Sequence, residues 1–263
     1  MKKKSGLTSI IIPTFNGLPM LASCIESIRE YTADVPYEII VVDNASTDGT
    51  DEYCIREGIV FLSLPANEGF PKACNLGLKV ARGDYLLLLN NDVTVTKNWL
   101  DNLLAAAESS PDIGLVGPVT NEASGIQKAQ ISFRDMSDFQ RIASGNNHSD
   151  PDRWIEAKRI IGMCLLFKRE VMNRIGYFDE AFSPGHYEDD DFCHRARLAG
   201  YRLLICGDVL VHHRGSASFK QSQPEQLRAL IDRNYRLFMD KWKFDPRQFI
   251  EEHQSEPEGG KVQ

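Results

Sequence analysis

Four carboxylates follow one another at Glu188, Asp189, Asp190 and Asp191. Adjacent acids repel each other, so we expect some of them to have raised pKa values or to need a cation nearby. Acids in the first turn of a helix also interact favourably with its dipole, and Asp191 can pair with Arg195 one turn later. This structural explanation covers Asp190 and Asp191. It does not require Glu188 and Asp189, which we place in the loop before the helix.

A second polar group ends an apolar run in the sequence YLLLLNND, at Asn90, Asn91 and Asp92. Oxygen-bearing side chains at the end of a rigid strand are hard ligands of the kind that Mg²⁺ or Mn²⁺ accepts, usually together with substrate phosphates. A single carboxylate is a poor metal site without such a phosphate. A turn that leads into the next helix is the alternative explanation for these residues.

Polar residues also follow the first two predicted strands, in SIIIPTFN and EIIVVDNASTDGT. Ligands of open parallel sheets bind beyond the carboxyl ends of the strands. Asn16 could instead cap the next helix, and Ser46 and Thr47 are ordinary helix caps. These explanations leave Asp43 and Asn44 unaccounted for. A carboxylate and an amide at a strand end suit the N3–H and the carbonyl groups of a pyrimidine base.

The segment NEGFPKACNLG places Asn67, Gly69 and Asn75 around the start of a predicted helix. Backbone N–H groups at a helix N-terminus can bind phosphate, and Lys72 could add a positive charge. Glycine turns and helix caps produce the same residues. This segment alone therefore does not decide between a phosphate site and a turn.

Two histidines, His212 and His213, end the last predicted strand. Side chains alternate between the two faces of a strand, so only one of the pair can face a cleft. Arg214 and Lys220 follow in a polar stretch, where they could close over a diphosphate or simply face solvent.

The elements that must position these residues alternate along the first 120 residues, as β-rich runs and helical patterns. Such alternation is typical of βαβ units and a mostly parallel sheet. Gly58 and Gly83 follow predicted helices, where a left-handed cap is needed. The expected strands are 9–12, 38–42, 60–64, 85–89 and 114–116, and the expected helices are 18–31, 47–57, 70–81 and 97–108.

The second half begins with a polar stretch, residues 120–154, in which periodicity fades and 145–152 resembles an exposed loop. Residues 224–243 have the apolar spacing of one amphipathic helix. We expect residues 1–223 to form one α/β domain, with this helix and a disordered tail in 224–263 packed on it. The other expected elements are a strand within 159–168, a helix at 169–175, a helix ending at 199, and strands at 202–206 and 209–212.

Composition excludes several classes of protein. The chain has 263 residues, of which 42% are hydrophobic, so it can bury a sizeable core. Its net charge of −7 argues against nucleic-acid binding, which needs a concentrated basic face. The six cysteines show no metal-binding spacing and are expected to be reduced core thiols. With no signal peptide or membrane span in the sequence, we expect a cytoplasmic protein.

The four strand-end segments occur in an order that resembles the family 2 glycosyltransferases of the GT-A fold, including rhamnosyltransferase-like bacterial members. The segments GMCLLFKREVMNRIGYFDEAF, YEDDDFCHRARLAGYRL and VLVHHRGSAS extend this resemblance over roughly residues 8–218. The resemblance implies an α/β, Rossmann-like fold with a mostly parallel mixed sheet flanked by helices.

Roles for individual residues follow from the same resemblance. It places the general base on Asp189, with Glu188 binding or orienting the acceptor. It implies a divalent cation, Mn²⁺ or Mg²⁺, held by Asp92 with Asn90 and His213, although Asn90 replaces the first acid of the family's metal motif. The implied donor nucleotide-binding residues are Pro13, Thr14, Asn16, Asp43, Asn44, Asn67, Gly69, Lys72, Asn75 and Asn91. Further candidates are His212 and Arg214. From their place in the chain alone, Trp154 beside the polar loop could stack on an acceptor sugar, and His186 lies near the acids.

The implied activity is inverting transfer of a sugar from a nucleoside-diphosphate donor, a UDP or dTDP sugar, to an acceptor hydroxyl. The acceptor would be a glycan, a lipid-linked glycan or a protein in bacterial surface glycan assembly, and contact with the inner face of the membrane is left open. One alternative is a catalytically inactive nucleotide-sugar binding protein, against which the intact Glu188–Asp189 pair argues. Another is a sugar-phosphate nucleotidyltransferase, but PTFNGLP lacks the basic glycine-rich loop of such enzymes.

Overall fold

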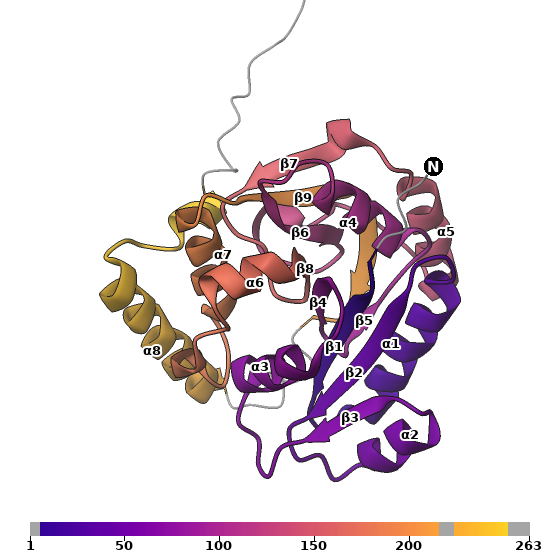
Figure 1. Cartoon of the computed structure of the whole chain (residues 1–263), viewed down its shortest axis with the longest axis horizontal. Coiled ribbons are helices and arrows are strands. Elements are labelled where there is room, and N and C mark those ends of the chain that lie inside the picture. The colour runs from indigo at the N-terminus through magenta and orange to yellow at the C-terminus, as the bar shows by residue number, and fades with distance from the viewer. Residues whose placement is uncertain (1–5, 216–223, 252–263) are drawn as a thin grey trace, which may run out of the picture.

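The computed structural model describes residues 6–215 and 224–251, arranged around a central sheet with the strand order β3-β2-β1-β4-β8-β6-β9-β5 (Figure 1). The parallel strands of the first half are β1 (Thr8–Thr14), β2 (Tyr37–Asp43), β3 (Val60–Ser63) and β4 (Tyr85–Leu89). The helices between them are α1 (Leu18–Tyr31), α2 (Thr50–Arg56) and α3 (Phe70–Val80). Because these strands run in one direction, their polar carboxyl ends meet at one edge of the sheet.

The second half makes the sheet mixed. β8 (Cys164–Lys168) lies antiparallel between β4 and β6 (Ile113–Thr120), and β6 pairs in parallel with β9 (Arg202–His213). β5 (Val93–Thr94) and β7 (Trp154–Ala157) both pair antiparallel with β9. Further helices are α4 (Trp99–Ala107), α5 (Met136–Asn146), α6 (Arg169–Ile175), α7 (Glu188–Leu198), α8 (Pro224–Trp242) and α9 (Gln248–Glu251), with short 3₁₀ helices at Gly125–Gln127, Pro151–Arg153 and Glu180–Phe182.

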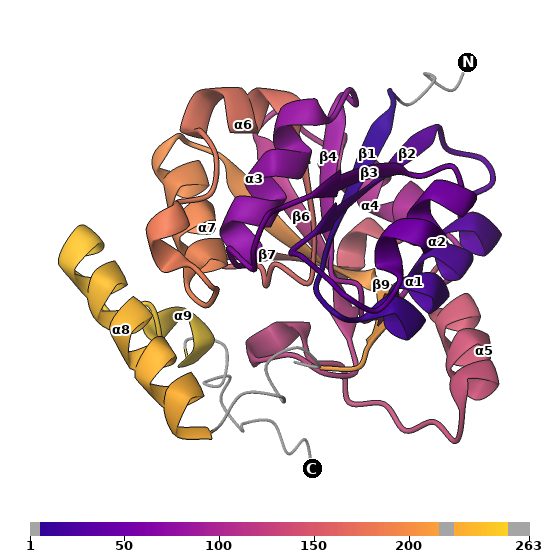
Figure 2. The same ribbon diagram turned by 90° about the horizontal axis from the view of Figure 1, so that it is seen from below.

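The core consists of two apolar layers, one on each face of the sheet. Ile10 and Ile12 of β1 pack with α1, α2 and α4, whereas Ile11 points to the opposite face and packs with α3, α6 and α7. Figure 2 shows these helices on the two sides of the strands, with α8 and α9 beside α7. A buried strand covered on both faces accounts for the continuous apolar runs of the sequence.

The six cysteines are buried and unpaired by disulfides, as predicted. They are Cys24, Cys54, Cys74, Cys164, Cys193 and Cys206. Burial raises the pKa of the Cys54 thiol to about 11 and raises the others further.

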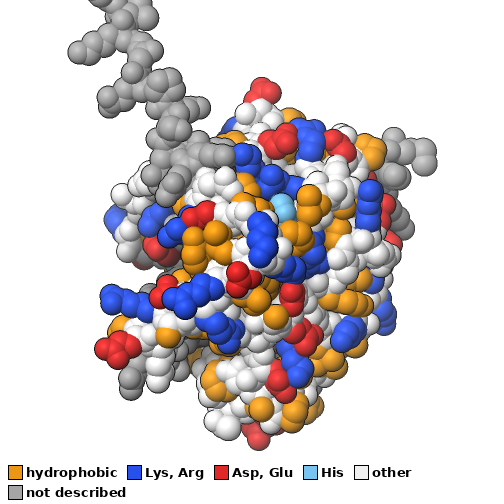
Figure 3. All heavy atoms as spheres, turned by 90° about the vertical axis from the view of Figure 1, so that its left-hand side faces the viewer, with side chains coloured by type: hydrophobic (Ala, Val, Ile, Leu, Met, Phe, Trp, Pro, Cys, Tyr) orange, Lys and Arg blue, Asp and Glu red, His pale blue; other side chains and the backbone are white. Residues whose placement is uncertain are grey.

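The face that α8 presents to solvent carries charges of both signs. Figure 3 shows Lys and Arg side chains interspersed with Asp and Glu over this side of the molecule. The face shown there lacks the uniformly basic surface that binding of a polyanion would require.

No helix among residues 6–215 and 224–251 is long and apolar enough to cross a membrane.

Several sequence predictions are wrong in detail. The polar stretch 120–154 contains α5, and the two strands predicted at 202–206 and 209–212 form one irregular strand, β9. Helix α2 begins at Thr50, after Ser46 and Thr47. Gly58 has the expected positive φ of 65°, but Gly83 does not. A Cβ on Gly83 would lie 2.5 Å from the Leu7 carbonyl oxygen, so this glycine permits a close backbone approach.

The acid cluster also lies differently from the prediction. Helix α7 begins at Glu188, so all four carboxylates occupy its first turn instead of being divided between loop and helix. The residue before it, Tyr187, has φ of 71° and provides no side-chain cap, which is why the sequence gives no start signal here. The tail after residue 251 and Lys220 lie outside the described residues.

The contact between α3 and the sheet yields a stability prediction. A Cβ on Gly77 would lie 2.3 Å from Ile11 Cγ2, whereas one on Gly145 of α5 would meet nothing within 4 Å. We expect Gly77→Ala to destabilise the protein by about 1–3 kcal/mol through overpacking. Gly145→Ala should be neutral or stabilise by up to about 1 kcal/mol, because alanine favours a helix. Thermal unfolding of both variants measures this, and equal melting temperatures would contradict it.

Candidate active site

The short pairing of β5 with β9 brings two predicted metal ligands together. Val93 lies opposite His213, so the carboxylate of Asp92 meets the imidazole, with Oδ1 3.3 Å from Nε2. The Nδ1 atom of His213 lies 2.9 Å from the Glu122 carbonyl oxygen. Asn121 holds the backbone of His213 on both sides, since its Oδ1 accepts from the N–H at 2.9 Å and its Nδ2 donates to the carbonyl at 3.0 Å.

Asp92 favours the protonated form of this histidine. Burial alone would lower the pKa of His213, but the hydrogen bond and charge of Asp92 outweigh burial and raise the pKa above its ordinary value. A hydrogen bond at Nδ1 also orients the ring so that Nε2 faces Asp92, an arrangement common for metal-binding histidines.

His212 points to the other face of β9, as strand alternation requires. Its ring makes edge contacts with Phe133 and Phe139, at centroid distances of 5.6 and 5.1 Å. Burial, with the nearby charges of Arg214 and His213, lowers the pKa of His212. The side chain of Arg214 is exposed, and its backbone N–H donates to the Asp92 carbonyl at 3.2 Å. The side chain of His213 therefore faces Asp92, and that of His212 lies in an aromatic cluster with Phe133 and Phe139.

The four acids of α7 have four different environments. Asp191 pairs with Arg195 at 2.8 Å, as predicted, and Asp190 pairs with Arg159 at 2.7 Å. Asp189 accepts two backbone N–H groups, from Gly162 at Oδ2 and from Asp190 at Oδ1, each at 2.9 Å. The two acids predicted to be structural thus have cationic partners, and Asp189 is oriented by the backbone.

Glu188 is the unusual member. It is buried, and its Oε2 atom has no hydrogen-bond partner within the part of the chain that the structure describes. Burial and the neighbouring charge of Asp189 raise the pKa of Glu188 well above its ordinary value. The surroundings of Glu188 therefore favour its protonated form, which can donate a hydrogen bond.

A cavity of about 480 Å³ joins the two groups of residues. Its walls include Asn90 and His213 from the strand ends, and His186, Glu188 and Asp189 from the start of α7. Burial lowers the pKa of the His186 imidazole. The backbone of this residue has a positive φ of 75°. The structure thus places the predicted base and His186 in the same cavity as the predicted metal ligand His213.

The predicted nucleotide residues at the ends of β1, β2 and β4 form a hydrogen-bonded group. Asn91 Nδ2 donates to Thr14 Oγ1 at 2.8 Å, and the Asn44 N–H donates to the Thr14 carbonyl at 2.9 Å. Asp43 accepts the Ser46 N–H at 3.0 Å. Asp43, Asn44, Asn91 and Pro13 are buried. These contacts fix the strand ends against one another.

Asn16 does not cap α1. Asn16 has a φ of 46°, and its Oδ1 accepts the Thr47 N–H at 2.8 Å. The backbone N–H of Asn16 donates to Ser46 Oγ at 2.8 Å. The first N–H of the helix, that of Leu18, is instead satisfied by Asp48 Oδ2 at 2.8 Å. Asn16 therefore joins the loops that follow β1 and β2.

Residues around the start of α3 divide into two groups. Asn67 accepts the Gly69 N–H at 3.1 Å, and the partly exposed Lys72 pairs with Glu68 at 2.8 Å. Asn75 is buried and turned to the loop after α6, where it exchanges two hydrogen bonds of 2.9 Å with the Phe178 backbone. These bonds explain Asn75 as a residue that fastens α3 to that loop.

Trp154 lies apart from the cavity. Its Nε1–H donates to the Asp208 carboxylate at 3.0 Å, and its ring packs against the core on β7. The geometry gives no support to the prediction that this ring contacts an acceptor.

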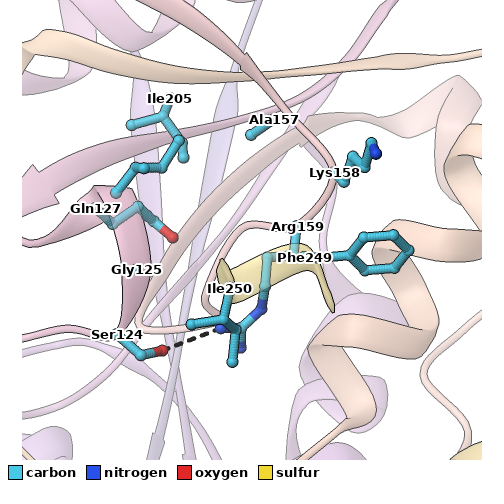
Figure 4. Close-up of a pocket in the computed structure, with 10 residues that line it drawn as sticks. Ser124, Gly125, Gln127, Ala157, Lys158, Arg159, Ile205, Phe249 and Ile250 are labelled. Carbon is cyan, nitrogen blue, oxygen red and sulfur yellow. Dashed lines mark hydrogen bonds between the residues drawn. The ribbon is translucent and has the colours of Figure 1, made fainter. Parts of the chain in front are cut away.

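Sequence reasoning missed Arg159, which lines the cavity beside Asp190. Figure 4 shows its side chain reaching Ser124, to which it donates at 3.0 Å, beneath Phe249 and Ile250 of α9. Ser124, Arg159 and Ile250 line both this small pocket and the larger cavity. Arg159 stands in an irregular segment before β8, so only its charge beside an apolar run could have indicated it.

Comparison with known proteins gives a consistent result. Residues 9–176 match the family model described as "Glycosyl transferase family 2". The O-antigen biosynthesis protein RfbC of Myxococcus xanthus is 27% identical over 82% of this chain and 18% of its own length. The N-acetylglucosaminyl-diphospho-decaprenol L-rhamnosyltransferase of Mycobacterium tuberculosis is 25% identical over 80% of this chain and 76% of its own. The chain spans 18% of RfbC and 28% of another relative, less than a third of either.

The fold agrees with a solved structure, that of the mannosyltransferase PcManGT from Pyrobaculum calidifontis in complex with GDP-Man and Mn²⁺. It superimposes with a TM-score of 0.66 at 21% identity, covering 95% of this chain and 69% of that one. The predicted GT-A fold is confirmed by this likeness and by the mixed sheet flanked by helices.

The raised pKa of Glu188 yields a pH prediction. A carboxyl group whose pKa is raised by folding binds a proton more tightly in the folded state, so its contribution to stability falls as the pH rises above the ordinary value near 4.5. We expect Glu188→Gln to raise the melting temperature at pH 8 but not at pH 4.5. Each kcal/mol gained in the free energy of unfolding corresponds to a rise of about 2–4 °C in the melting temperature of a domain of this size. Glu26→Gln, on the exposed side of α1, is the matched control. A pH-independent difference at Glu188 would contradict this interpretation.

Proposed function

The chain belongs to glycosyl transferase family 2, and we propose that it is an inverting glycosyltransferase that moves a sugar from a nucleoside-diphosphate sugar to an acceptor hydroxyl. One observation carries this proposal. The Asp92–His213 pair adjoins the cavity that also contains Glu188 and Asp189, with His213 in its wall, although these residues come from distant parts of the chain. Neither an inactive binding protein nor a nucleotidyltransferase is favoured by any feature of this site.

Asp189 is the proposed general base. Its two backbone hydrogen bonds fix the carboxylate beside the cavity. The acceptor oxygen attacks the anomeric carbon from the face opposite the diphosphate, the bond from that carbon to the diphosphate oxygen breaks, and the hydroxyl proton passes to Asp189. Such general-base catalysis contributes about 10²- to 10⁴-fold in rate. Glu188, whose surroundings favour the protonated form, would donate a hydrogen bond to a substrate oxygen.

Asp92 and His213 suit a divalent cation. Both are buried, their Oδ1 and Nε2 atoms are close, and the second ring nitrogen of His213 is held by a carbonyl oxygen. Within the described residues no group of three or more His, Cys, Asp or Glu forms a complete metal site. This pair would therefore bind the cation together with substrate phosphate and water, with Asn90 beside it. When bound, a cation stabilises negative charge on the departing diphosphate.

The charge of the cavity supports the same conclusion. Among the described residues that line it, Glu122, Glu188, Asp189 and Asp190 are acidic, and Arg159 already pairs with Asp190. An anionic diphosphate would be repelled by this lining unless a cation came with it.

The strand ends that carry Thr14, Asp43 and Asn44 are the proposed nucleotide subsite, and we propose UDP or dTDP as the carrier. Asn16, Asn67, Gly69, Lys72 and Asn91 would support it. RfbC and the rhamnosyltransferase are named for O-antigen synthesis and for a lipid-linked acceptor. We therefore propose a role in surface glycan assembly, with a glycan or lipid-linked acceptor, at the inner face of a membrane.

Removal of the proposed base tests the reaction. A thermal-shift screen of UDP, dTDP and GDP sugars with Mn²⁺ first identifies the donor, because stabilisation grows with the ratio of ligand concentration to Kd. Asp189→Asn should keep that thermal shift but lower release of the nucleoside diphosphate by about 10²- to 10⁴-fold. Asp34→Asn, an exposed change of the same kind, should leave both unchanged. Near-normal turnover in Asp189→Asn would remove Asp189 from this role.

The cation site has its own test. EDTA should lower activity and Mn²⁺ or Mg²⁺ should restore it. Asp92→Asn and His213→Gln should each lose the Mn²⁺-dependent part of the thermal shift given by the nucleotide. His212→Gln should retain it despite lower stability, because His212 faces the aromatic cluster. Full activity in chelator would exclude the proposed cation.

A further inference from the structure

We propose that Asn234, on the C-terminal helix α8, is a positioning residue that holds the base-bearing segment at residues 182–189 in its working conformation. This inference rests on the proposed function. Asn234 is fully buried, and its Nδ2 donates to the carbonyls of Phe182, Gly185 and His186 at 2.7, 2.7 and 3.0 Å. The two N–H groups of one amide are thus shared among three carbonyl groups of the segment that leads into α7.

The segment needs such support because its backbone is unfavourable. His186 and Tyr187 both have positive φ, 75° and 71°, although neither is a glycine. Conformations of this kind cost about 1–3 kcal/mol each and persist only where the surroundings determine them. The residues that follow them are Glu188 and Asp189, so a change in this backbone would move both carboxylates.

Other contacts of α8 hold the same segment at its two ends. Lys241 pairs with Asp179 at 2.6 Å before the segment and with Asp191 at 2.7 Å after it. The Trp242 Nε1–H also donates to Asp191, at 2.8 Å. Asn234 therefore acts in the middle of a span whose ends are fastened by the last turn of the same helix.

The opposite side of the segment rests on the start of α3. The Pro184 carbonyl accepts the Phe70 N–H at 2.9 Å, and a Cβ on Gly69 would lie 2.5 Å from Pro184 Cα. The segment is thus held between α8 and α3, and His186, Glu188 and Asp189 face the cavity between them. Of the proposed nucleotide residues, Gly69 lies against this segment, whereas Thr14, Asp43 and Asn44 lie at the ends of β1 and β2. The Asn234 side chain hydrogen-bonds to the carbonyls of the segment and to Arg233, and to neither of those strands.

This division predicts separate effects on turnover and on donor binding. Asn234→Asp replaces the N–H donors by carboxylate oxygens, which repel the three carbonyls. Small misplacements of catalytic groups can cost about 10²-fold, so we expect kcat for donor hydrolysis to fall at least about 10-fold. The donor KM should stay within about 2-fold, because the ends of β1 and β2 that carry Thr14, Asp43 and Asn44 do not depend on Asn234. Asn173→Asp on the exposed side of α6 is the matched control and should change neither value.

The experiment measures nucleoside diphosphate release from the donor found in the nucleotide-sugar screen, together with hydrogen–deuterium exchange of peptides covering residues 178–191. Asn234→Asp should raise exchange in those peptides and leave β1 and β4 protected. Trp242→Phe is a second, milder variant that tests the same contact between α8 and the segment if Asn234→Asp folds poorly. It removes one donor to Asp191 and should lower kcat by a smaller factor at an unchanged donor KM.

Wild-type kcat and wild-type exchange at 178–191 in Asn234→Asp would overturn the proposal. So would a general rise in exchange over the whole chain in both variants, with kcat and active fraction falling together, because that is the result of lost stability alone. If the wild-type protein releases no nucleoside diphosphate from any donor, the proposed function fails. Local exchange at 178–191 in Asn234→Asp then still decides whether Asn234 holds the segment.

Discussion

The pairing of β5 with the end of β9 is the contact on which the site depends. β5 has two residues, and it pairs with β9, the last strand along the chain. The pairing therefore joins the two halves of the chain. It brings Asp92 to His213 and ties Arg214 to the Asp92 carbonyl. A shift of one residue would turn His212 toward Asp92 and move His213 among the phenylalanines. The register of this short ladder therefore selects the histidine that serves the cavity.

The first turn of α7 gives each of its four adjacent acids a different environment. Asp190 and Asp191 each meet an arginine, and Asp189 meets two backbone N–H groups. Glu188 has no such partner at Oε2 among the described residues, and burial raises its pKa well above the ordinary value. Four adjacent acids can share one turn because three of them have cationic or backbone N–H partners and the surroundings of the fourth favour its protonated form.

The scaffold follows from the sequence where one physical signal dominates. Buried parallel strands require apolar runs, and the polar residues that end them identify the binding edge, so β1, β2 and β4 were predictable. Helix α5 buries only Phe139 and Ala143, too few apolar residues for its period to be seen. The start of α7 has no capping side chain, and β5 exists only through its partner. The pair Arg159–Asp190 arises from a tertiary contact between distant segments that no local pattern records, and Asp92 and His213 could be brought together only through the family resemblance.

The buried cysteines give the fold a set of internal reporters. Three of them, Cys24, Cys54 and Cys74, lie on helices of the first half, and Cys164, Cys193 and Cys206 lie on elements of the second. Thiol reagents attack the thiolate, and burial raises the pKa of each of these groups. Alkylation of the native protein must therefore wait for local opening. The order in which the six sites are modified would rank the two halves of the molecule by how readily they open.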